Sequence, residues 1–189
     1  MRPSAAAPTE APAPTEAPAA APTEAPAAAP TEAPAPAEAA IKAGQVTDIG
    51  GINDASFNEL AWKGMQDAEL DFGVEIAFLE SQQQTDYDKN INEFLQQDYD
   101  LIVTVGFLLG DATQAAAEAN PDAKFAIVDV NYLSAPNILQ SQFAVDQNSF
   151  MAGYLAAGVS KTGKVGTFGG INIPPVVQFM VGFEKGVDY

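Results

Sequence analysis

The residues in this sequence that are best suited to chemistry are acidic side chains in short turns. Asp48 precedes Ile-Gly-Gly, and Asp129 precedes Val-Asn. Each follows a run of apolar residues that indicates a β-strand. A carboxylate in such a place can act as a nucleophile, coordinate Mg²⁺, bind a ligand or cap its own turn. A phosphoaspartyl mechanism at Asp48 needs a second acid two residues on, where Gly50 stands.

The composition excludes several other chemistries. The 189 residues include no cysteine and no histidine, which excludes disulfides, thiol nucleophiles, Ser–His and Cys–His triads and imidazole metal ligands. The formal net charge is −17. An acidic chain without a basic run repels phosphate backbones, so no nucleic-acid polymer is expected as a partner. No metal and no cofactor are predicted, and a Mg²⁺ pocket between Asp48 and Asp129 stays open as an alternative.

One aromatic residue, Phe57, has more than one interpretation. Phe57 opens a predicted helix whose apolar face continues through Leu60 and Met65, and an aromatic at helical spacing is usually buried in the core. The same ring would stand at the mouth of a cleft if the helix begins beside the ends of the strands. Spacing alone leaves both interpretations of Phe57 open. Tyr132 is interpreted more simply, as a packing or surface residue.

The segments that position these residues alternate between strand and helix. Short apolar runs predict strands over residues 41–47, 74–79, 101–105, 125–128, 138–143 and 164–168. Helical spacing, with a capping box from Ser56 to Glu59, predicts helices that begin near residues 56, 85, 111, 149 and 174. This alternation is typical of an α/β fold with a parallel sheet flanked by helices. Ligands bind such sheets at the carboxyl ends of the strands, where Asp48, Gly106 and Asp129 are expected.

Residues 1–40 differ in composition from the rest of the chain. They hold 10 of the 14 prolines, no aromatic and no branched aliphatic residue, and they repeat Ala-Pro-Thr-Glu-Ala-Pro. A segment with so little apolar area cannot offset the entropy of ordering, so we predict a disordered linker. It is either an untethered tail or an extended stalk that holds a domain away from a surface. Membrane association is expected only through an anchor upstream of Met1.

Several motifs, in order, resemble the basic membrane protein family of ABC-importer substrate-binding lipoproteins. The longest is Val46-Thr-Asp-Ile-Gly-Gly-Ile-Asn-Asp-Ala-Ser-Phe-Asn58, followed by Ala61-Trp-Lys-Gly64. The others are Val105-Gly-Phe107, Pro121-Asp-Ala-Lys-Phe125 with Ile127-Val-Asp129, Ser149-Phe-Met-Ala-Gly153, and Lys161-Thr-Gly-Lys-Val-Gly166 with Gly169-Gly170. The resemblance covers residues 41–189. It implies a type I periplasmic-binding-protein-like fold, in which two α/β lobes close on a purine nucleoside.

The resemblance also implies a division of the chain and roles for single residues. We expect a linker over residues 1–40, a complete first lobe over 41–144 and a truncated second lobe over 145–189. Phe57 would stack on the base, and Asp129 would bind the edge of the base. The other expected ligand-binding positions lie on the first lobe's side of the cleft: Asp48, Asp54, Ser56, Asn58 and Gly106.

The expected function is that of an extracytoplasmic, membrane-anchored solute-binding protein, not an enzyme, which delivers a nucleoside to an ABC permease. A neutral nucleoside offers a flat ring for an aromatic residue and polar edges for carboxylates. A phosphorylated ligand would be repelled by Asp48, Asp54 and Asp129. Two alternatives stay open: a receptor for a sugar or another small molecule on the same fold, and a metal-dependent hydrolase with an acidic pocket.

Overall fold

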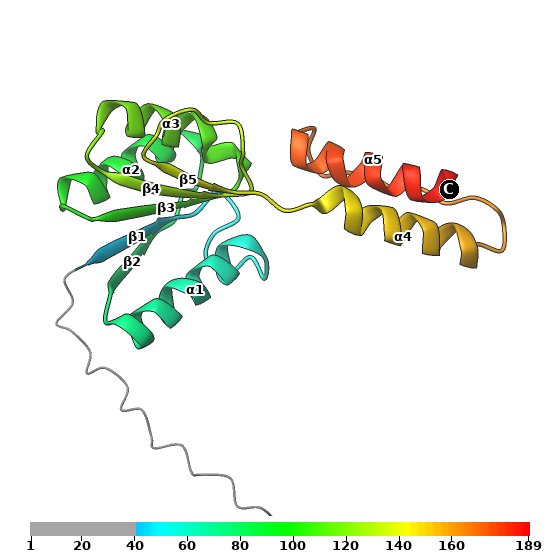
Figure 1. Ribbon diagram of the computed structural model, residues 1–189, viewed down its shortest axis with the longest axis horizontal. Helices are drawn as coiled ribbons and strands as arrows, with labels where there is room; N and C mark the ends of the chain where they lie inside the picture. Colours follow the sequence, from blue (N-terminus) through cyan, green and yellow to red (C-terminus); the bar gives the residue numbers. More distant parts are fainter. Residues whose placement is uncertain (1–40) are drawn as a thin grey trace, which may run out of the picture. The chain divides into compact units, whose positions relative to one another are not determined.

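The computed structural model describes residues 41–189, and they begin with a five-stranded parallel sheet (Figure 1). The strand order is β2-β1-β3-β4-β5, and all four neighbouring pairs are parallel. The strands are β1 (Lys42–Val46), β2 (Glu75–Leu79), β3 (Leu101–Val105), β4 (Lys124–Val128) and β5 (Ile138–Ser141). The predicted α/β class and the first five strands are therefore confirmed. The linker predicted over residues 1–40 lies outside the described residues.

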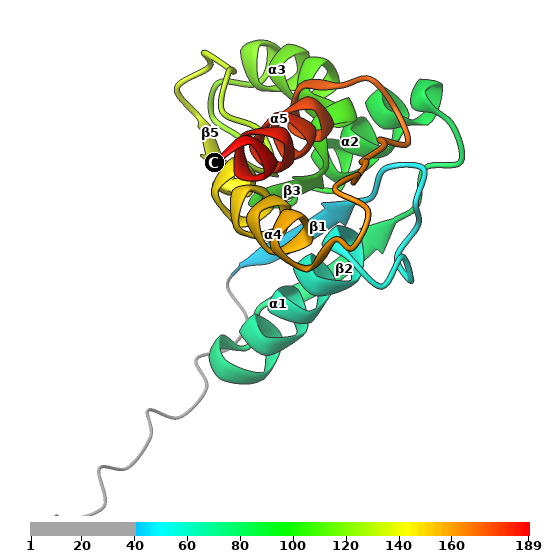
Figure 2. The same ribbon diagram turned by 90° about the vertical axis from the view of Figure 1, so that its right-hand side faces the viewer.

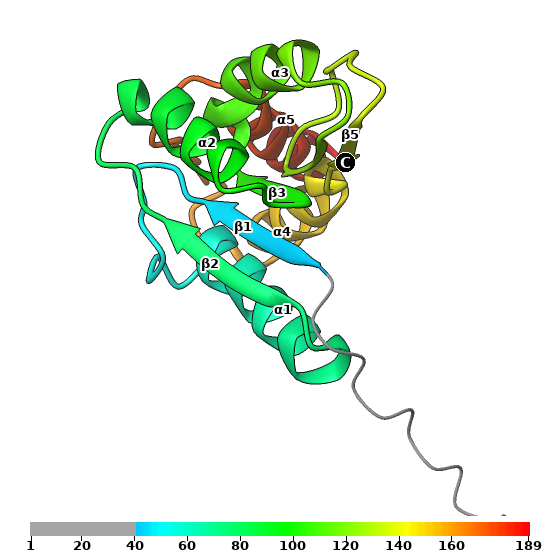
Figure 3. The same cartoon turned by 90° about the vertical axis from the view of Figure 1, so that its left-hand side faces the viewer.

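Helices cover both faces of this sheet. They are α1 (Phe57–Phe72), α2 (Tyr87–Gln96) and α3 (Gly110–Ala119), with short 3₁₀ turns η1 (Gln84–Asp86) and η2 (Phe107–Leu109) before the last two. The crossover from β1 to β2 runs in one direction along the sheet, and those from β2 to β3 and from β3 to β4 run in the other. Because such crossovers are right-handed, α1 lies on one face and α2 and α3 on the opposite face (Figures 1 and 3).

The main core lies between the sheet and α2 and α3. It is built from fully buried apolar side chains of the strands and of these two helices. Among them are Ile91, Ile102, Leu109, Phe125 and Ile127. This packing holds the carboxyl ends of β1, β3 and β4 side by side, since burial of one face strongly specifies the register of a strand.

The structure corrects the predicted cap of α1. The helix begins after Ser56 as expected, but the Ser56 side chain makes no capping hydrogen bond. The carboxylate of Asp54 accepts hydrogen bonds from the backbone amides of Ser56, Asn58 and Glu59 at 2.9 to 3.1 Å. Ala55, between the two candidate caps, has a φ of 53°. Because the backbone turns at Ala55, the carboxylate of Asp54, and not the hydroxyl of Ser56, reaches the free amides at the start of α1.

The apolar face predicted for α1 is also corrected in part. Met65 is buried, but Leu60 is 71% exposed. The predicted core role of Leu60 is therefore wrong. Helix α1 contacts β2 and β3, and helical spacing alone cannot say which of its side chains those strands cover.

The remaining described residues form two helices, α4 (Val145–Val159) and α5 (Pro174–Asp188), which pack side by side (Figures 1 and 2). Their backbones approach so closely that a Cβ at Gly182 would meet the backbone of Asp146, and one at Gly186 would meet the backbone of Phe150. Helix α4 begins four residues before the predicted start near residue 149. The division into lobes at residue 144 stays a prediction.

The strand predicted over residues 164–168 is absent from the described chain. A β-strand needs a neighbouring strand for its backbone hydrogen bonds, and none of the described strands pairs with this segment. Apolar alternation alone therefore gave the wrong prediction here. No helix within residues 41–189 combines the length and the apolar character that crossing a membrane requires.

Candidate functional site

The predicted site residues follow the carboxyl ends of three neighbouring strands. Asp48 comes two residues after β1, Gly106 directly follows β3, and Asp129 directly follows β4. These strands are adjacent in the order β1-β3-β4. The sequence therefore placed all three at the edge of the sheet where parallel α/β folds bind ligands.

A buried amide joins two of the carboxylates. The Asn58 side chain donates hydrogen bonds through Nδ2 to Asp48 Oδ1 at 2.9 Å and to Asp54 Oδ2 at 3.1 Å. Asp48 Oδ1 also accepts the backbone amide of Gly50 at 2.9 Å. Asn58 is only 1% exposed, so it holds the two carboxylates in place. Its predicted direct contact with a ligand stays a prediction.

Sequence reasoning missed the residue that supports this amide. Gln45, in the middle of β1, is fully buried and donates through Nε2 to the backbone carbonyl of Asn58 at 3.0 Å. The available signal was a long polar side chain in the middle of an otherwise buried strand. Such a residue is buried only with a hydrogen-bond partner, so it marks a polar contact beneath the site.

The electrostatics of Asp54 follow from its position at the start of α1. Burial by itself would raise its pKa, but hydrogen bonds from the amides of Glu59, Asn58 and Ser56 and from the Asn58 side chain outweigh that effect and lower the pKa. The positive end of the helix dipole favours the same charged form. Asp54 is therefore ionised at neutral pH, and both of its carboxylate oxygens accept hydrogen bonds from residues at the start of α1.

Gly106 has a backbone that favours glycine. Its φ is 106°, and a Cβ there would lie 3.1 Å from Asp48 Oδ2. A side chain at position 106 would therefore crowd the carboxylate of Asp48. The expected contact between Gly106 and a ligand stays a prediction.

Asp129 is the most unusual carboxylate of the three. It is 8% exposed and has a φ of 68°, and its backbone amide donates to Ser141 of β5 at 2.7 Å. Burial raises the pKa of its side chain, and no described residue donates a hydrogen bond that would lower it. The residue lines a cavity of about 300 Å³, so its carboxylate can be reached from that side. This side chain is thus suited to accept hydrogen bonds from an incoming donor.

Phe57 lies beside a different cavity, of about 590 Å³. The cavity is also lined by Ser56, Leu60 and Phe143, and by residues of α4 and α5. The Phe57 ring is half-buried and packs at 5.8 Å between centroids against Phe143, which is 51% exposed. The ring therefore lines an open cavity rather than the closed core, and its expected contact with a ligand stays a prediction.

The structure brings some of the predicted residues together and separates others. Asp48, Asp54, Asn58 and Gly106 form one connected cluster through the contacts above. Asp129 lines a second cavity, of about 300 Å³, with Phe107 and Tyr132. It is next to the Phe57 cavity, because Val128 and Phe143 line one and their chain neighbours Asp129 and Gln142 line the other. Within residues 41–189, no three Asp or Glu side chains are grouped so that they could hold a metal ion.

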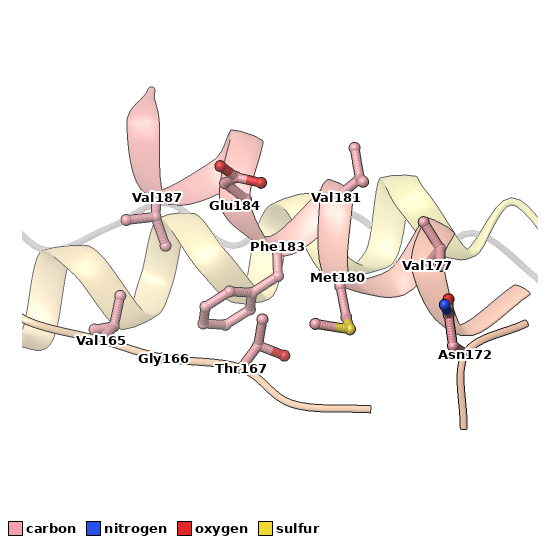
Figure 4. Close-up of a pocket in the computed structure, with 10 residues that line it drawn as sticks. All are labelled: Val165, Gly166, Thr167, Asn172, Val177, Met180, Val181, Phe183, Glu184 and Val187. Carbon is pink, nitrogen blue, oxygen red and sulfur yellow. The ribbon is translucent and has the colours of Figure 1, made fainter. Parts of the chain in front are cut away.

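A further groove runs along α5 and contains none of the predicted site residues. It has a volume of about 490 Å³ and is mostly apolar, with Thr167, Asn172 and Glu184 as its polar side chains. Figure 4 shows Met180 and Phe183 of α5 directed toward Val165 and Thr167 of the preceding segment. The groove lies on α5 and its preceding segment, and not at the carboxyl ends of the strands, where parallel α/β folds bind ligands.

The described residues share their fold with solved solute-binding proteins of ABC transporters. A solved solute-binding protein of an ABC transporter system from Aeropyrum pernix K1 superposes with a TM-score of 0.71 and 30% identity, covering 79% of this chain and 43% of that one. A second, from Conexibacter woesei, has a TM-score of 0.60 at 24% identity and covers 79% of this chain and 50% of that one. The latter likeness concerns the fold alone.

Sequence comparison identifies the family. The model of the family described as "ABC transporter substrate-binding protein PnrA-like" matches residues 41–189, and the chain belongs to that family. The "ABC transporter nucleoside-binding protein BmpA" of Lactococcus lactis is 38% identical over 150 residues, covering 77% of this chain and 43% of the relative. "Basic membrane protein A" of Borreliella burgdorferi is 36% identical over 143 residues, covering 74% and 42%. The chain thus spans less than half the length of these relatives, and the resemblance to the basic membrane proteins is confirmed.

Proposed function

We propose that this chain belongs to a non-enzymatic, extracytoplasmic, membrane-anchored solute-binding protein that delivers a purine nucleoside to an ABC permease. The family supports the solute-binding role. The name of the Lactococcus relative, a nucleoside-binding protein, supports the choice of a nucleoside.

The observation that carries the choice of ligand is the carboxylate of Asp129, which accepts no hydrogen bond from residues 41–189 and lines a cavity at the sheet edge. It can accept a hydrogen bond there, and purine bases such as guanine and hypoxanthine carry N–H donors on one edge. The Phe57 ring would supply a stacking face, which is worth about 1–3 kcal/mol per base. Asp48, Ser56 and Gly106 would complete the first lobe's side of the cleft.

The charges of the site favour a nucleoside over a nucleotide. Asp48 and Asp54 share one amide, and Asp129 is buried nearby on the same edge of the sheet. A phosphate group placed near these carboxylates would be repelled, the more so because the site is partly removed from water. We therefore propose that the ligand is uncharged.

Calorimetric titration of the full-length protein with inosine, guanosine, D-ribose and inosine 5′-monophosphate tests this function. The proposal predicts saturable binding of the nucleosides, much weaker binding of the monophosphate and unchanged nucleoside after prolonged incubation. Binding of ribose but not of nucleosides would favour the sugar-receptor alternative. Turnover that depends on Mg²⁺ would favour the acidic-pocket hydrolase and refute the proposal.

A further inference from the structure

The cavity that Asp129 lines has an aromatic wall, of which Phe107 belongs to the family motifs and Tyr132 does not. Phe107, from the turn before α3, and Tyr132, from the loop between β4 and β5, lie 5.4 Å apart between ring centroids at an angle of 47°. Both line the cavity of about 300 Å³. Tyr132 is 49% exposed, so one part of its ring packs on Phe107 and another part faces the open side.

The loop that carries Tyr132 is unusually well fixed for a segment without regular structure. The side-chain amide of Gln140 in β5 binds both backbone groups of Leu133. Its Nε2 donates to the Leu133 carbonyl at 2.9 Å, and its Oε1 accepts a hydrogen bond from the Leu133 amide at 2.8 Å. Gln114 of α3 accepts the amides of Ser134 and Ala135 at 3.0 and 3.3 Å. The backbone on the C-terminal side of Tyr132 is therefore pinned to two elements of the core.

The far end of the loop is fixed as well. Asn137 Nδ2 donates to the carbonyls of Ala117, Asn120 and Ala123 at 2.9 to 3.2 Å. The Tyr132 hydroxyl lies so close to the first residue of α3 that a Cβ at Gly110 would collide with it. The glycine at position 110 therefore leaves room for the ring, which packs on Phe107.

These contacts differ from what packing alone requires. A half-exposed surface tyrosine contributes little to stability and is usually free to change rotamer. A rigid aromatic beside a polar group is instead the arrangement that lowers the entropic cost of binding, because less ordering remains to be done when the ligand arrives. The amide contacts above order the loop before any ligand is present.

We propose that Tyr132, backed by Phe107, is a ligand-contacting and specificity-determining residue that packs against the planar ring of an uncharged ligand. Asp129 accepts a hydrogen bond from the donor edge of the same ring. This inference rests on the proposed nucleoside-binding function and adds to it a residue from the β4–β5 loop. It replaces the interpretation of Tyr132 as a packing or surface residue. The cavity selects a flat ring with a hydrogen-bond donor over a bare sugar, because a sugar presents no extended π-face to Tyr132.

The test is a titration of inosine into the full-length protein and its Tyr132→Ala variant, with Tyr154→Ala as the matched control. Tyr154 is 56% exposed on α4 and lines neither the Asp129 nor the Phe57 cavity. Loss of one aromatic contact to a base should weaken binding about tenfold in Tyr132→Ala, with a melting temperature equal to that of the control. Equal inosine affinity in Tyr132→Ala and in the wild type would overturn this inference and leave the nucleoside function intact, whereas failure of the wild type to bind any nucleoside would refute the function itself.

A double-mutant cycle separates a ligand contact from a general effect on folding. Gly110→Ala should weaken inosine binding in the wild-type background, because the new Cβ displaces the Tyr132 hydroxyl. In the Tyr132→Ala background the same change should have no further effect on affinity, since the displaced group is gone. Additive losses in the double variant would show that Gly110 acts independently of Tyr132 and would contradict the proposed contact.

Discussion

The cap of α1 offers the sharpest test of how the structure holds the acidic cluster. The Asp54→Ala change removes one carboxylate that accepts three backbone amides and the Asn58 side chain. Replacing an N-cap acceptor by alanine costs about 0.5–2 kcal/mol, and the number of amides involved places this change near the upper end. At about 2–4 °C per kcal/mol for a domain of this size, the melting temperature should fall by about 4–8 °C.

A second variant in the same helix provides the control. Asp67→Ala removes a carboxylate whose partner is Lys63, one turn earlier, in an exposed ion pair. Such i,i+4 pairs contribute only about 0.3–0.5 kcal/mol. Thermal unfolding of both variants followed by circular dichroism at neutral pH should therefore show a much larger effect for Asp54. Equal melting temperatures would refute the assignment of Asp54 as the cap.

The difference in stability between the wild type and Asp54→Ala should depend on pH, because the pKa of Asp54 is lowered. A depressed carboxyl pKa adds stability that is fully present above the ordinary value of about 3.9 and is lost as the pH falls through the folded-state value. The difference between the wild type and Asp54→Ala should therefore shrink in acid. A difference that is the same at pH 7 and at about pH 2 would contradict this account.

The remaining predictions concern the other residues near the strand ends. Burial raises the pKa of Asp129, so ionisation of its side chain destabilises the fold as the pH rises through the folded-state pKa. Asp129→Asn should therefore melt at a higher temperature than the wild type at pH 7, and this difference should disappear in acid, while nucleoside binding weakens. A lower melting temperature of the variant at pH 7 would refute the reasoning. Phe57→Ala should weaken nucleoside binding by about 1–3 kcal/mol with little loss of stability, whereas Met65→Ala, at a buried position, should cost about 2–5 kcal/mol of stability, as calorimetry and melting curves would check. Leu60→Ala, at a position 71% exposed, should change the free energy of unfolding by less than about 0.5 kcal/mol, and a core-sized loss on denaturant unfolding would contradict its placement.

The order of strands and helices could be predicted from the sequence because each βαβ unit carries its own signals. Apolar runs such as 101–105 and the turn at Gly106 are local features, and right-handed crossovers then place the carboxyl ends of β1, β3 and β4 together. Asp48 and Asp129 could therefore be assigned to one edge of the sheet without knowledge of the structure.

The wrong predictions have a different physical origin. Each concerned a contact with a segment elsewhere in the chain, which local sequence patterns do not predict. The exposure of Leu60 is decided by the strands on which α1 packs, and the segment 164–168 lacks a neighbouring strand to pair with. Asp54, and not the predicted Ser56, caps α1 because the backbone turns at Ala55. The separation of Phe57 from Asp129 into two cavities likewise arises from side chains of several elements.

The most direct test of the central claim is a crystal structure of the full-length protein with inosine bound. The account predicts that the donor edge of the base lies about 2.7–3.0 Å from a carboxylate oxygen of Asp129, with the base at the carboxyl ends of β3 and β4. Inosine bound in the apolar groove along α5, or with its ribose rather than its base at Asp129, would contradict the account.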